Sequence, residues 1–229
     1  MEYFYLYVLF LICFIIGMSY FNTYCNTAYK ESFNTEKQTF VLLGDSIFKN
    51  DAYVSDGKSV EKLLEERTNG KTKCLAVDQA KIIDIYDQIE SIPEDINNTN
   101  TTIFLSAGGN DILTYYVEND KGNKTDPNIL NPMFSAYKKV VKNIQSKFPN
   151  TNIVLLDIYY PENLKYKQYQ PIISEWNKKI YKYAEDPKNN IASVLKISTI
   201  LTSKEDFSFG IEPSSKGGEK MVESILSSY

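Results

Sequence analysis

Apolar and polar positions follow two alternating periodicities along most of the chain. Short apolar runs typical of buried strands lie at residues 39–43, 73–77, 102–106, 152–158 and 192–197. Apolar residues at helical spacing follow each run, at 59–68, 82–92, 137–148, 172–180 and 221–226. Strands that alternate with helices predict a three-layer α/β fold, with a flavodoxin-like parallel sheet of about five strands.

The N-terminal segment has a different pattern. From Tyr3 to Tyr20 the chain carries no charge and is almost wholly apolar, which is long enough to cross a bilayer as a helix. Because Glu2 precedes it in place of a basic cluster, an anchor is favoured over a cleaved signal peptide. The predicted organisation is a transmembrane anchor or signal peptide at 1–21, a polar tether at 22–38 and one domain at 39–229.

Charge and composition exclude several functional classes. A formal net charge of −4 and interleaved lysines and acids leave no basic face for nucleic acid. The chain has no histidine, which excludes a Ser-His-Asp triad and every His-based metal site. No metal or cofactor is expected, and nothing indicates an oligomeric state. The chain has three cysteines, Cys13, Cys25 and Cys74. Buried inert thiols are favoured because Cys13 lies in the first apolar segment and Cys74 in a predicted strand, and a Cys25–Cys74 bridge is left open.

Asparagine sequons give a weak indication of compartment. Asn97, Asn100 and Asn123 each begin an N-x-S/T sequon, which favours a lumenal or extracellular domain behind the anchor. Acids balance the lysines of the tether, so the charge pattern leaves the membrane orientation open.

Two strand ends carry the candidate chemistry. The first apolar run stops at Gly44 and is followed at once by Asp45 and Ser46, while the third runs into Gly108, Gly109, Asn110 and Asp111. In a sheet of flavodoxin-like order, the ligand crevice opens between the carboxyl ends of the first and third strands. Ser46 and Asn110 are therefore predicted to meet in one crevice.

Three segments together resemble the SGNH (GDSL-type) hydrolases: Gly44-Asp45-Ser46, Gly108-Gly109-Asn110-Asp111, and the segment IEPSSKGG at 211–218. The resemblance covers residues 39–228. It implies that Ser46 is the nucleophile and that Gly109 and Asn110 contact the substrate. It also implies an oxyanion hole built from the backbone N–H of Ser46, the backbone N–H at position 79 and the side chain of Asn110. An Asp-x-x-His pair before the last helix is the base in that family.

Two family positions differ in this chain. Gln79 replaces a glycine, so a backbone N–H remains but a side chain is expected to lean over the pocket. Glu212 replaces the histidine, Phe209 stands where the aspartate would be, and the nearest upstream acid is Asp206. This segment is similar to a branch of SGNH-like proteins that has Glu-Pro-Ser in place of His-Pro-Ser.

The chemistry can be stated from the residues alone. A serine hydroxyl needs a base, and the oxyanion that forms needs donors placed in advance. Ser46 and Asn110 supply the attacking oxygen and one donor, so Glu212 has to be the base. An apolar crevice or a nearby Asp206 would raise its pKa. Because a carboxylate is a weaker base than imidazole, slow turnover is expected.

Each candidate also has a purely structural interpretation. Ser46 could cap the segment that follows it, Asn110 and Asp111 could stabilise a loop, and Glu212 could be a charge at a helix start. For the aromatic residues Tyr159, Tyr160 and Trp176, packing is favoured over a role in an acyl or sugar pocket.

The leading hypothesis is a membrane-tethered hydrolase that cleaves a carboxylic ester, such as an O-acetyl group on a glycan or a lipid acyl ester. Its partners would be that small-molecule, lipid or glycan ester and the membrane. The alternative is a degenerate SGNH fold that binds a glycan or ester ligand without cleaving it. A nucleotide binder is disfavoured because no Gly-x-Gly-x-x-Gly or Walker-type loop follows any strand.

Overall fold

The computed structural model describes residues 14, 17–19, 38–118 and 129–228. The chain divides into two units, Met1–Glu36 with Tyr229 and Lys37–Ser228. Of the first unit only Phe14 and Gly17–Ser19 are described, and they are helical. Within the described ranges, no helix is long and apolar enough to span a membrane. The anchor at 1–21, the tether at 22–38, Cys13, Cys25 and Asn123 fall almost wholly outside those ranges and stay predictions.

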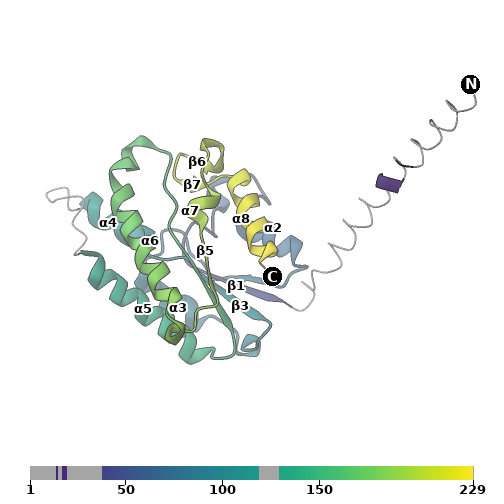
Figure 1. Ribbon diagram of the computed structural model, residues 1–229, viewed down its shortest axis with the longest axis horizontal. Helices are drawn as coiled ribbons and strands as arrows, with labels where there is room; N and C mark the ends of the chain where they lie inside the picture. The colour runs from purple at the N-terminus through teal and green to yellow at the C-terminus, as the bar shows by residue number, and fades with distance from the viewer. Residues whose placement is uncertain (1–13, 15–16, 20–37, 119–128, 229) are drawn as a thin grey trace, which may run out of the picture. The chain divides into compact units, whose positions relative to one another are not determined.

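A parallel sheet of five strands forms the centre of the second unit (Figure 1). The strands are β1 (Thr39–Leu43), β2 (Thr72–Cys74), β3 (Thr101–Leu105), β4 (Asn152–Leu156) and β5 (Ser193–Leu195). Their order is β2-β1-β3-β4-β5, which is the flavodoxin-like order. The predicted fold class is confirmed. Since β1 lies between β2 and β3, the carboxyl ends of β1 and β3 meet at the centre of one sheet edge.

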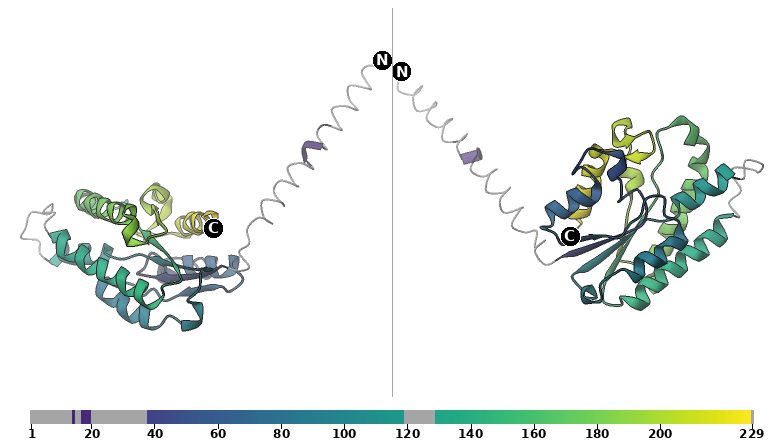
Figure 2. Two further views of the ribbon diagram at one scale, coloured as in Figure 1. Left: turned by 60° about the horizontal axis from the view of Figure 1, so that its bottom comes forward. Right: turned by 180° about the vertical axis from the view of Figure 1, so that it is seen from behind.

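Helices cover both faces of this sheet, as Figures 1 and 2 show. One face packs against α3 (Ile85–Glu90), α5 (Leu130–Lys147) and α6 (Gln170–Glu185), whose apolar stripes join one core with alternate residues of β1, β3 and β4. On the other face, α2 (Val60–Arg67) packs beside α8 (Ser215–Ser227). The remaining helices are α4 (Gly109–Glu118) and α7 (Ile197–Ile200).

Three elements differ from the sequence-based expectation. The sequence pattern gives no helix between the run at 102–106 and residue 137, but α4 starts directly at Gly109. Residues 82–92 begin as a 3₁₀ turn at Ile82–Asp84 before α3. A two-stranded antiparallel hairpin, β6 (Phe207–Ser208) and β7 (Glu212–Pro213), precedes α8 and places Glu212 on a strand. Such short elements depend on tertiary contacts more than on periodicity.

The turn that carries Ser46 is held by a buried glutamine. Gly44 adopts a φ of +148°, and a Cβ there would lie 2.4 Å from the carbonyl oxygen of Ser106, so only glycine fits. Gln88 of α3 binds the same glycine from both sides. The Gly44 N–H donates to Gln88 Oε1 at 2.7 Å, and Gln88 Nε2 donates to the Gly44 carbonyl at 2.8 Å. Both backbone groups of Gly44 are thereby satisfied where β1 leaves the sheet.

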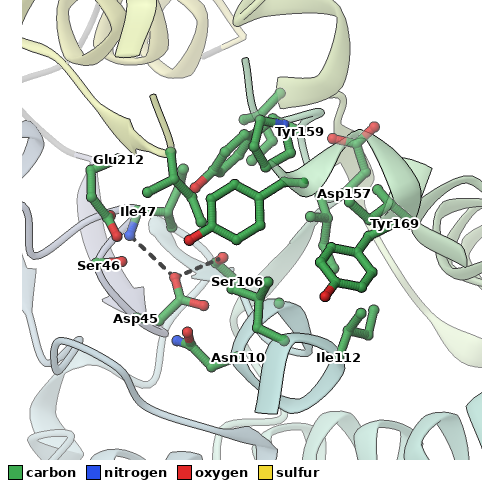
Figure 3. Close-up of a pocket in the computed structure, with 18 residues that line it drawn as sticks. Asp45, Ser46, Ile47, Ser106, Asn110, Ile112, Asp157, Tyr159, Tyr169 and Glu212 are labelled. Atoms are coloured by element: carbon green, nitrogen blue, oxygen red, sulfur yellow. Dashed lines mark hydrogen bonds between the residues drawn. The ribbon is translucent and has the colours of Figure 1, made fainter. Parts of the chain in front are cut away.

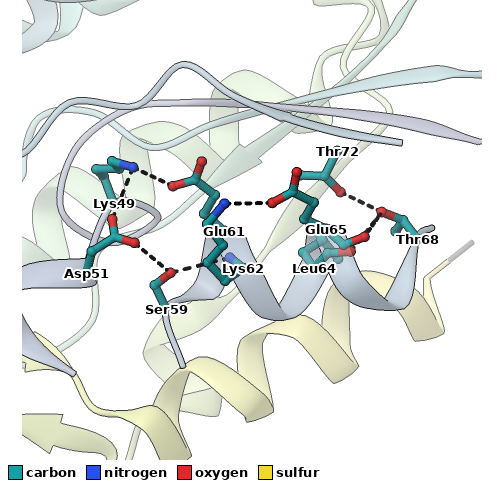
Figure 4. A network of polar contacts seen from close by, with 9 residues as sticks. All are labelled: Lys49, Asp51, Ser59, Glu61, Lys62, Leu64, Glu65, Thr68 and Thr72. Carbon is teal, nitrogen blue, oxygen red and sulfur yellow. Dashed lines mark hydrogen bonds and ion pairs between the residues drawn. The ribbon is translucent and has the colours of Figure 1, made fainter. Parts of the chain in front are cut away.

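A buried asparagine links the segment after Ser46 to the hairpin. Asn50 is fully buried, its Nδ2 donates to the Pro213 carbonyl at 3.0 Å, and its Oδ1 accepts from the Val60 N–H at 2.9 Å. Outside this contact, Lys49 pairs with Asp51 and with Glu61 of α2 (Figure 4). The Asn50–Pro213 bond ties the segment after Ser46 to the strand of Glu212.

The end of β4 is held in the same way by α6. Asn177 Oδ1 accepts from the Ile158 N–H at 2.8 Å, and Asn177 Nδ2 donates to the Ile158 carbonyl at 2.7 Å. The neighbouring Trp176 is fully buried against Gly108, where a Cβ would lie 2.3 Å from the indole ring. One turn of α6 therefore positions both the β3–α4 turn and the segment that follows β4.

The Gln88 contact generates a stability prediction. Gln88→Leu keeps the side chain large and buried but leaves the Gly44 N–H unpaired, which costs about 1–3 kcal/mol. The Gly44 carbonyl still accepts from the Val77 N–H at 3.0 Å. We expect a loss of roughly 1–3 kcal/mol in the free energy of unfolding, measured by urea denaturation.

The matched control is Gln168→Leu, because Gln168 lies on an exposed turn of the chain. Its effect should stay within about 0.5 kcal/mol. Equal stability of the two variants would contradict the assigned role of Gln88.

Candidate active site

A pocket opens at the carboxyl ends of the central strands (Figure 3). Its polar wall contains Asp45, Ser46, Ser106, Asn110 and Glu212, contributed by β1, β3, α4 and β7 and the turns beside them. The rest is mainly apolar and aromatic and consists of Ile47, Gly109, Ile112, Leu113, Asp157, Ile158, Tyr159, Pro161, Tyr166, Tyr169, Ile173, Ile197 and Ile211. The structure therefore brings Ser46, Gly109, Asn110 and Glu212 to one pocket.

Asp45 and Ser46 form the first part of the polar wall, where each side chain is only 8% exposed. Asp45 Oδ1 accepts from the Ile47 N–H at 3.2 Å and from the Ser106 hydroxyl at 3.4 Å. Burial, with a contribution from the negative charge of Glu212, raises the pKa of Asp45 to about 7, and the two hydrogen bonds oppose that rise. Asp45 is thus protonated over much of the range in which an ordinary aspartate is charged.

The β6–β7 hairpin, in which Glu212 pairs with Ser208, places Glu212 beside Ser46. Figure 3 shows its carboxylate directed toward Ser46 and the Ile47 backbone nitrogen. Burial raises the pKa of Glu212 above its ordinary value, the Ser46 hydroxyl opposes this as a hydrogen-bond partner, and Asp78 adds a further rise. A carboxylate with a raised pKa, beside a serine hydroxyl, has the geometry and basicity that a general base requires.

Asn110 stands in the first turn of α4, across the pocket from Glu212 in Figure 3. Its Nδ2 donates to the Ala80 carbonyl at 3.1 Å. An amide nitrogen has two hydrogens, so the second is free to serve a ligand in the pocket. The neighbouring Asp111 accepts from the Ile82 N–H at 3.0 Å and fixes α4 against the connection after β2.

Gln79 does not behave as the sequence predicted. The backbone of Gln79 is left-handed, with a φ of +62°, a conformation that favours glycine. Glycine is the residue that the SGNH hydrolases have at this position. The expectation that its side chain leans over the pocket was wrong: Gln79 is exposed, is absent from the pocket lining and hydrogen-bonds with Tyr53 instead. The left-handed backbone turns the side chain away from the pocket.

Asp206 was expected to act beside Glu212, and the structure does not bring it to the pocket. Its carboxylate is fully buried, pairs with Lys220 of α8 and accepts the N–H groups of Thr202 and Ser203. Burial favours a higher pKa, but these hydrogen bonds outweigh it and hold the pKa below its ordinary value. Asp206 therefore fixes the loop before the hairpin, and Asp78 is the acid that raises the pKa of Glu212.

The site contains several acids and no basic residue among the described residues that line it. Asp78 lies beside it and accepts from the Tyr53 hydroxyl at 2.8 Å. Even so, no group of three or more His, Cys, Asp or Glu residues suited to a metal ion occurs in the part of the chain that the structure describes.

Sequence reasoning missed Ser106 and Asp157 as pocket residues and favoured packing for Tyr159, while it placed Asp45 at the ligand end of the first strand without assigning it a role. Asp157 directly follows β4, so the rule that located Ser46 and Asn110 at strand ends could have found it. It accepts from the backbone N–H and hydroxyl of Ser198 and from the hydroxyl of Tyr181. Trp176 packs in the core, as favoured from sequence, whereas Tyr159 lines the pocket.

The arrangement is a three-layer α/β fold with a serine just after the first strand. Several solved structures of other proteins share this fold. The chain superimposes with a TM-score of 0.61 on a lipolytic G-D-S-L family member from Veillonella parvula, at 16% identity over 84% of this chain and 98% of that one. It also matches phospholipase A1 from Streptomyces albidoflavus, with a TM-score of 0.61 and 14% identity over 84% and 100% of the two chains.

A third match is the lipase Lip_vut3 from a goat rumen metagenome, with a TM-score of 0.62 and 19% identity over 83% and 96% of the two chains. The sequence matches no protein-family model and no curated protein. The chain therefore has the SGNH (GDSL-type) hydrolase fold.

The pKa of Asp45 generates a prediction on stability against pH. Asp45 binds its proton more tightly in the folded protein than in the unfolded chain, so stability falls as the pH rises from 3.8 toward about 7. Asp45→Asn removes this loss. Relative to the wild type, the variant should gain roughly 1–4 kcal/mol in the free energy of unfolding between about pH 5 and about pH 8.

Asp206→Asn is the comparison. The pKa of Asp206 lies below its ordinary value of 3.8, so its carboxylate is charged at about pH 5 and at about pH 8. The variant should therefore lose the same stability at both of these pH values. Urea unfolding of the three proteins at the two pH values measures both effects. A stability difference between Asp45→Asn and wild type that does not change with pH would rule out a raised pKa at Asp45.

Proposed function

We propose that this chain is a serine hydrolase of carboxylic esters in which Ser46 is the nucleophile and Glu212 the base. The observation that supports the proposal most strongly is the convergence of Ser46, Glu212 and Asn110 on one pocket from three distant parts of the sequence. The fold is one that lipases and a phospholipase share.

The proposed reaction needs no group beyond these side chains and water. Ser46 Oγ attacks the ester carbonyl while Glu212 takes its proton, and the carbonyl oxygen becomes an oxyanion beside the Asn110 amide and the Ser46 N–H. Collapse of this intermediate expels the alcohol, which takes the proton back from Glu212. Water then attacks the acyl-enzyme in the same way and releases the acid.

The apolar wall of the pocket supports an acyl group as the part of the substrate that is bound. Ile112, Leu113, Ile173 and Ile197 line the pocket and offer an alkyl chain an uncharged, apolar surface. Both a glycan O-acetyl group and a lipid acyl ester meet this requirement. Membrane tethering through Tyr3–Tyr20, with the domain in a lumenal or extracellular space, belongs to the same proposal.

A ligand-binding protein without hydrolysis is the competing function. It would retain the pocket and its donors but not an activated serine. A fluorophosphonate probe separates the two, because it labels only a serine that has a base and an oxyanion hole.

The first prediction concerns the base. Glu212→Gln keeps the shape of the side chain and removes its basicity, so it should lower kcat for ester hydrolysis by 100-fold or more, on the order expected for general-base catalysis. In the wild type, kcat/KM should rise with pH through a value above the 4.5 of an ordinary glutamate, because burial raises the pKa of Glu212.

Glu205→Gln is the matched control, because Glu205 is exposed and lies outside the pocket lining. Its rate should equal that of the wild type. A fully active Glu212→Gln enzyme would exclude Glu212 as the base. A wild type that hydrolyses no ester and takes no probe at Ser46 would favour the binding protein.

The second prediction concerns the oxyanion hole. Asn110→Ala removes a donor that strengthens as charge develops on the carbonyl oxygen, so kcat should fall by about 10²–10³-fold with little change in KM. The melting temperature should change little, since the side chain makes one hydrogen bond to Ala80. Unchanged kcat combined with lower stability would show that Asn110 only supports the turn.

A further inference from the structure

Tyr159 reaches the pocket from the segment that follows β4, and two contacts hold it there. The Asn177 amide fixes the Ile158 backbone directly before it. The Tyr159 ring packs against Phe207 of β6 with ring centroids 5.4 Å apart and an interplanar angle of 38°. Since Phe207 begins the hairpin that carries Glu212, the phenol and the carboxylate are positioned by one structural unit.

The hydroxyl of Tyr159 faces the reacting groups. In Figure 3 the ring of Tyr159 extends toward the side of the pocket where Ser46, Asp45 and Glu212 lie. Burial, and then the charges of Glu212 and Asp45, raise the pKa of Tyr159 well above its ordinary value, so the phenol stays a donor at every working pH. Among the described residues, no hydrogen-bond partner satisfies this hydroxyl.

Asn110 and Tyr159 stand on opposite walls of the pocket in Figure 3, with Ser46 at the side between them. An ester held for attack by Ser46 presents two oxygens, the carbonyl oxygen and the oxygen of the leaving alcohol. The Asn110 wall is the place for the carbonyl oxygen. The leaving oxygen then points to the opposite wall, where Glu212 and Tyr159 lie.

We propose that the Tyr159 hydroxyl donates a hydrogen bond to the leaving oxygen of the ester and so assists expulsion of the alcohol. This inference rests on the proposed function and adds a catalytic residue to it. A lone carboxylic acid at Glu212 has to return the proton to the leaving oxygen without the imidazolium charge that His-bearing enzymes use. A second donor at that oxygen lowers its charge as the bond breaks.

Expulsion of the alcohol needs no reactant beyond the ester and these side chains. As the intermediate collapses, the electron pair of the carbon–oxygen bond moves to the leaving oxygen, and the oxyanion pair re-forms the carbonyl. The proton that Ser46 gave to Glu212 passes to the leaving oxygen. Tyr159 keeps its own proton throughout and contributes only the hydrogen bond, so its effect depends on how much charge the leaving oxygen carries.

The experiment compares two esters of the same short acid with the wild type and Tyr159→Phe. An ethyl ester has a strongly basic leaving oxygen, and a p-nitrophenyl ester has a weakly basic one. Tyr159→Phe should lower kcat/KM for the ethyl ester by roughly 10- to 100-fold and for the nitrophenyl ester by less than about threefold. Because both rates come from one preparation, their ratio does not depend on the fraction of folded enzyme.

Tyr160→Phe is the matched control, since Tyr160 is the adjacent residue, is half-buried and lies outside the pocket lining. It should leave the ratio of the two rates unchanged. Equal losses of Tyr159→Phe on both esters, or no loss on either, would overturn the role at the leaving oxygen while leaving the hydrolase intact. A wild type inactive on both esters overturns the proposed function and this inference with it.

Discussion

The active-site geometry depends on backbone groups that lose their sheet partners where the strands end. Buried N–H and C=O groups left unpaired are costly, and at three such points the chain supplies a buried carboxamide. Gln88 binds Gly44, Asn177 binds Ile158, and Asn50 joins Pro213 to Val60. Each amide uses its donor and its acceptor, so each fixes direction as well as distance. Ser46, Glu212 and Tyr159 all lie within two residues of one of these bonds.

Such rigid placement matters because the site concentrates acids, with no cation among the described residues that line it. Burial raises the cost of ionising both Asp45 and Glu212; the charge of Glu212 adds to this cost at Asp45, and the charge of Asp78 adds to it at Glu212. Two carboxyl groups that lie close together in a buried pocket are costly to ionise at the same time. A protonated Asp45 therefore permits a charged Glu212, which is the state a general base requires. The Ile47 N–H and the Ser106 hydroxyl hold Asp45 beside Ser46.

The sequence predicted the sheet order and the meeting of Ser46 with Asn110, because both follow from apolar runs and from the topology of parallel strands. Other features depended on contacts that periodicity does not encode. The β6–β7 hairpin has only two residues per strand, and α4 begins on glycine and polar residues that read as a loop. Asp206 is drawn away from the pocket by Lys220, which lies 14 residues along the chain, and the left-handed backbone of Gln79 directs its side chain outward.

The residues at positions 209 and 212 are chemically consistent with each other. In the Asp-x-x-His arrangement, the aspartate fixes which imidazole nitrogen carries the proton and how the ring is turned. A carboxylate base has no tautomer to select, so Glu212 needs no such partner and is oriented by the hairpin and Asn50 instead. Phe209 is exposed, with a left-handed φ of +54°, and packs edge-on against Tyr53. In the proposed mechanism, a glutamate base at position 212 therefore needs no acid at position 209.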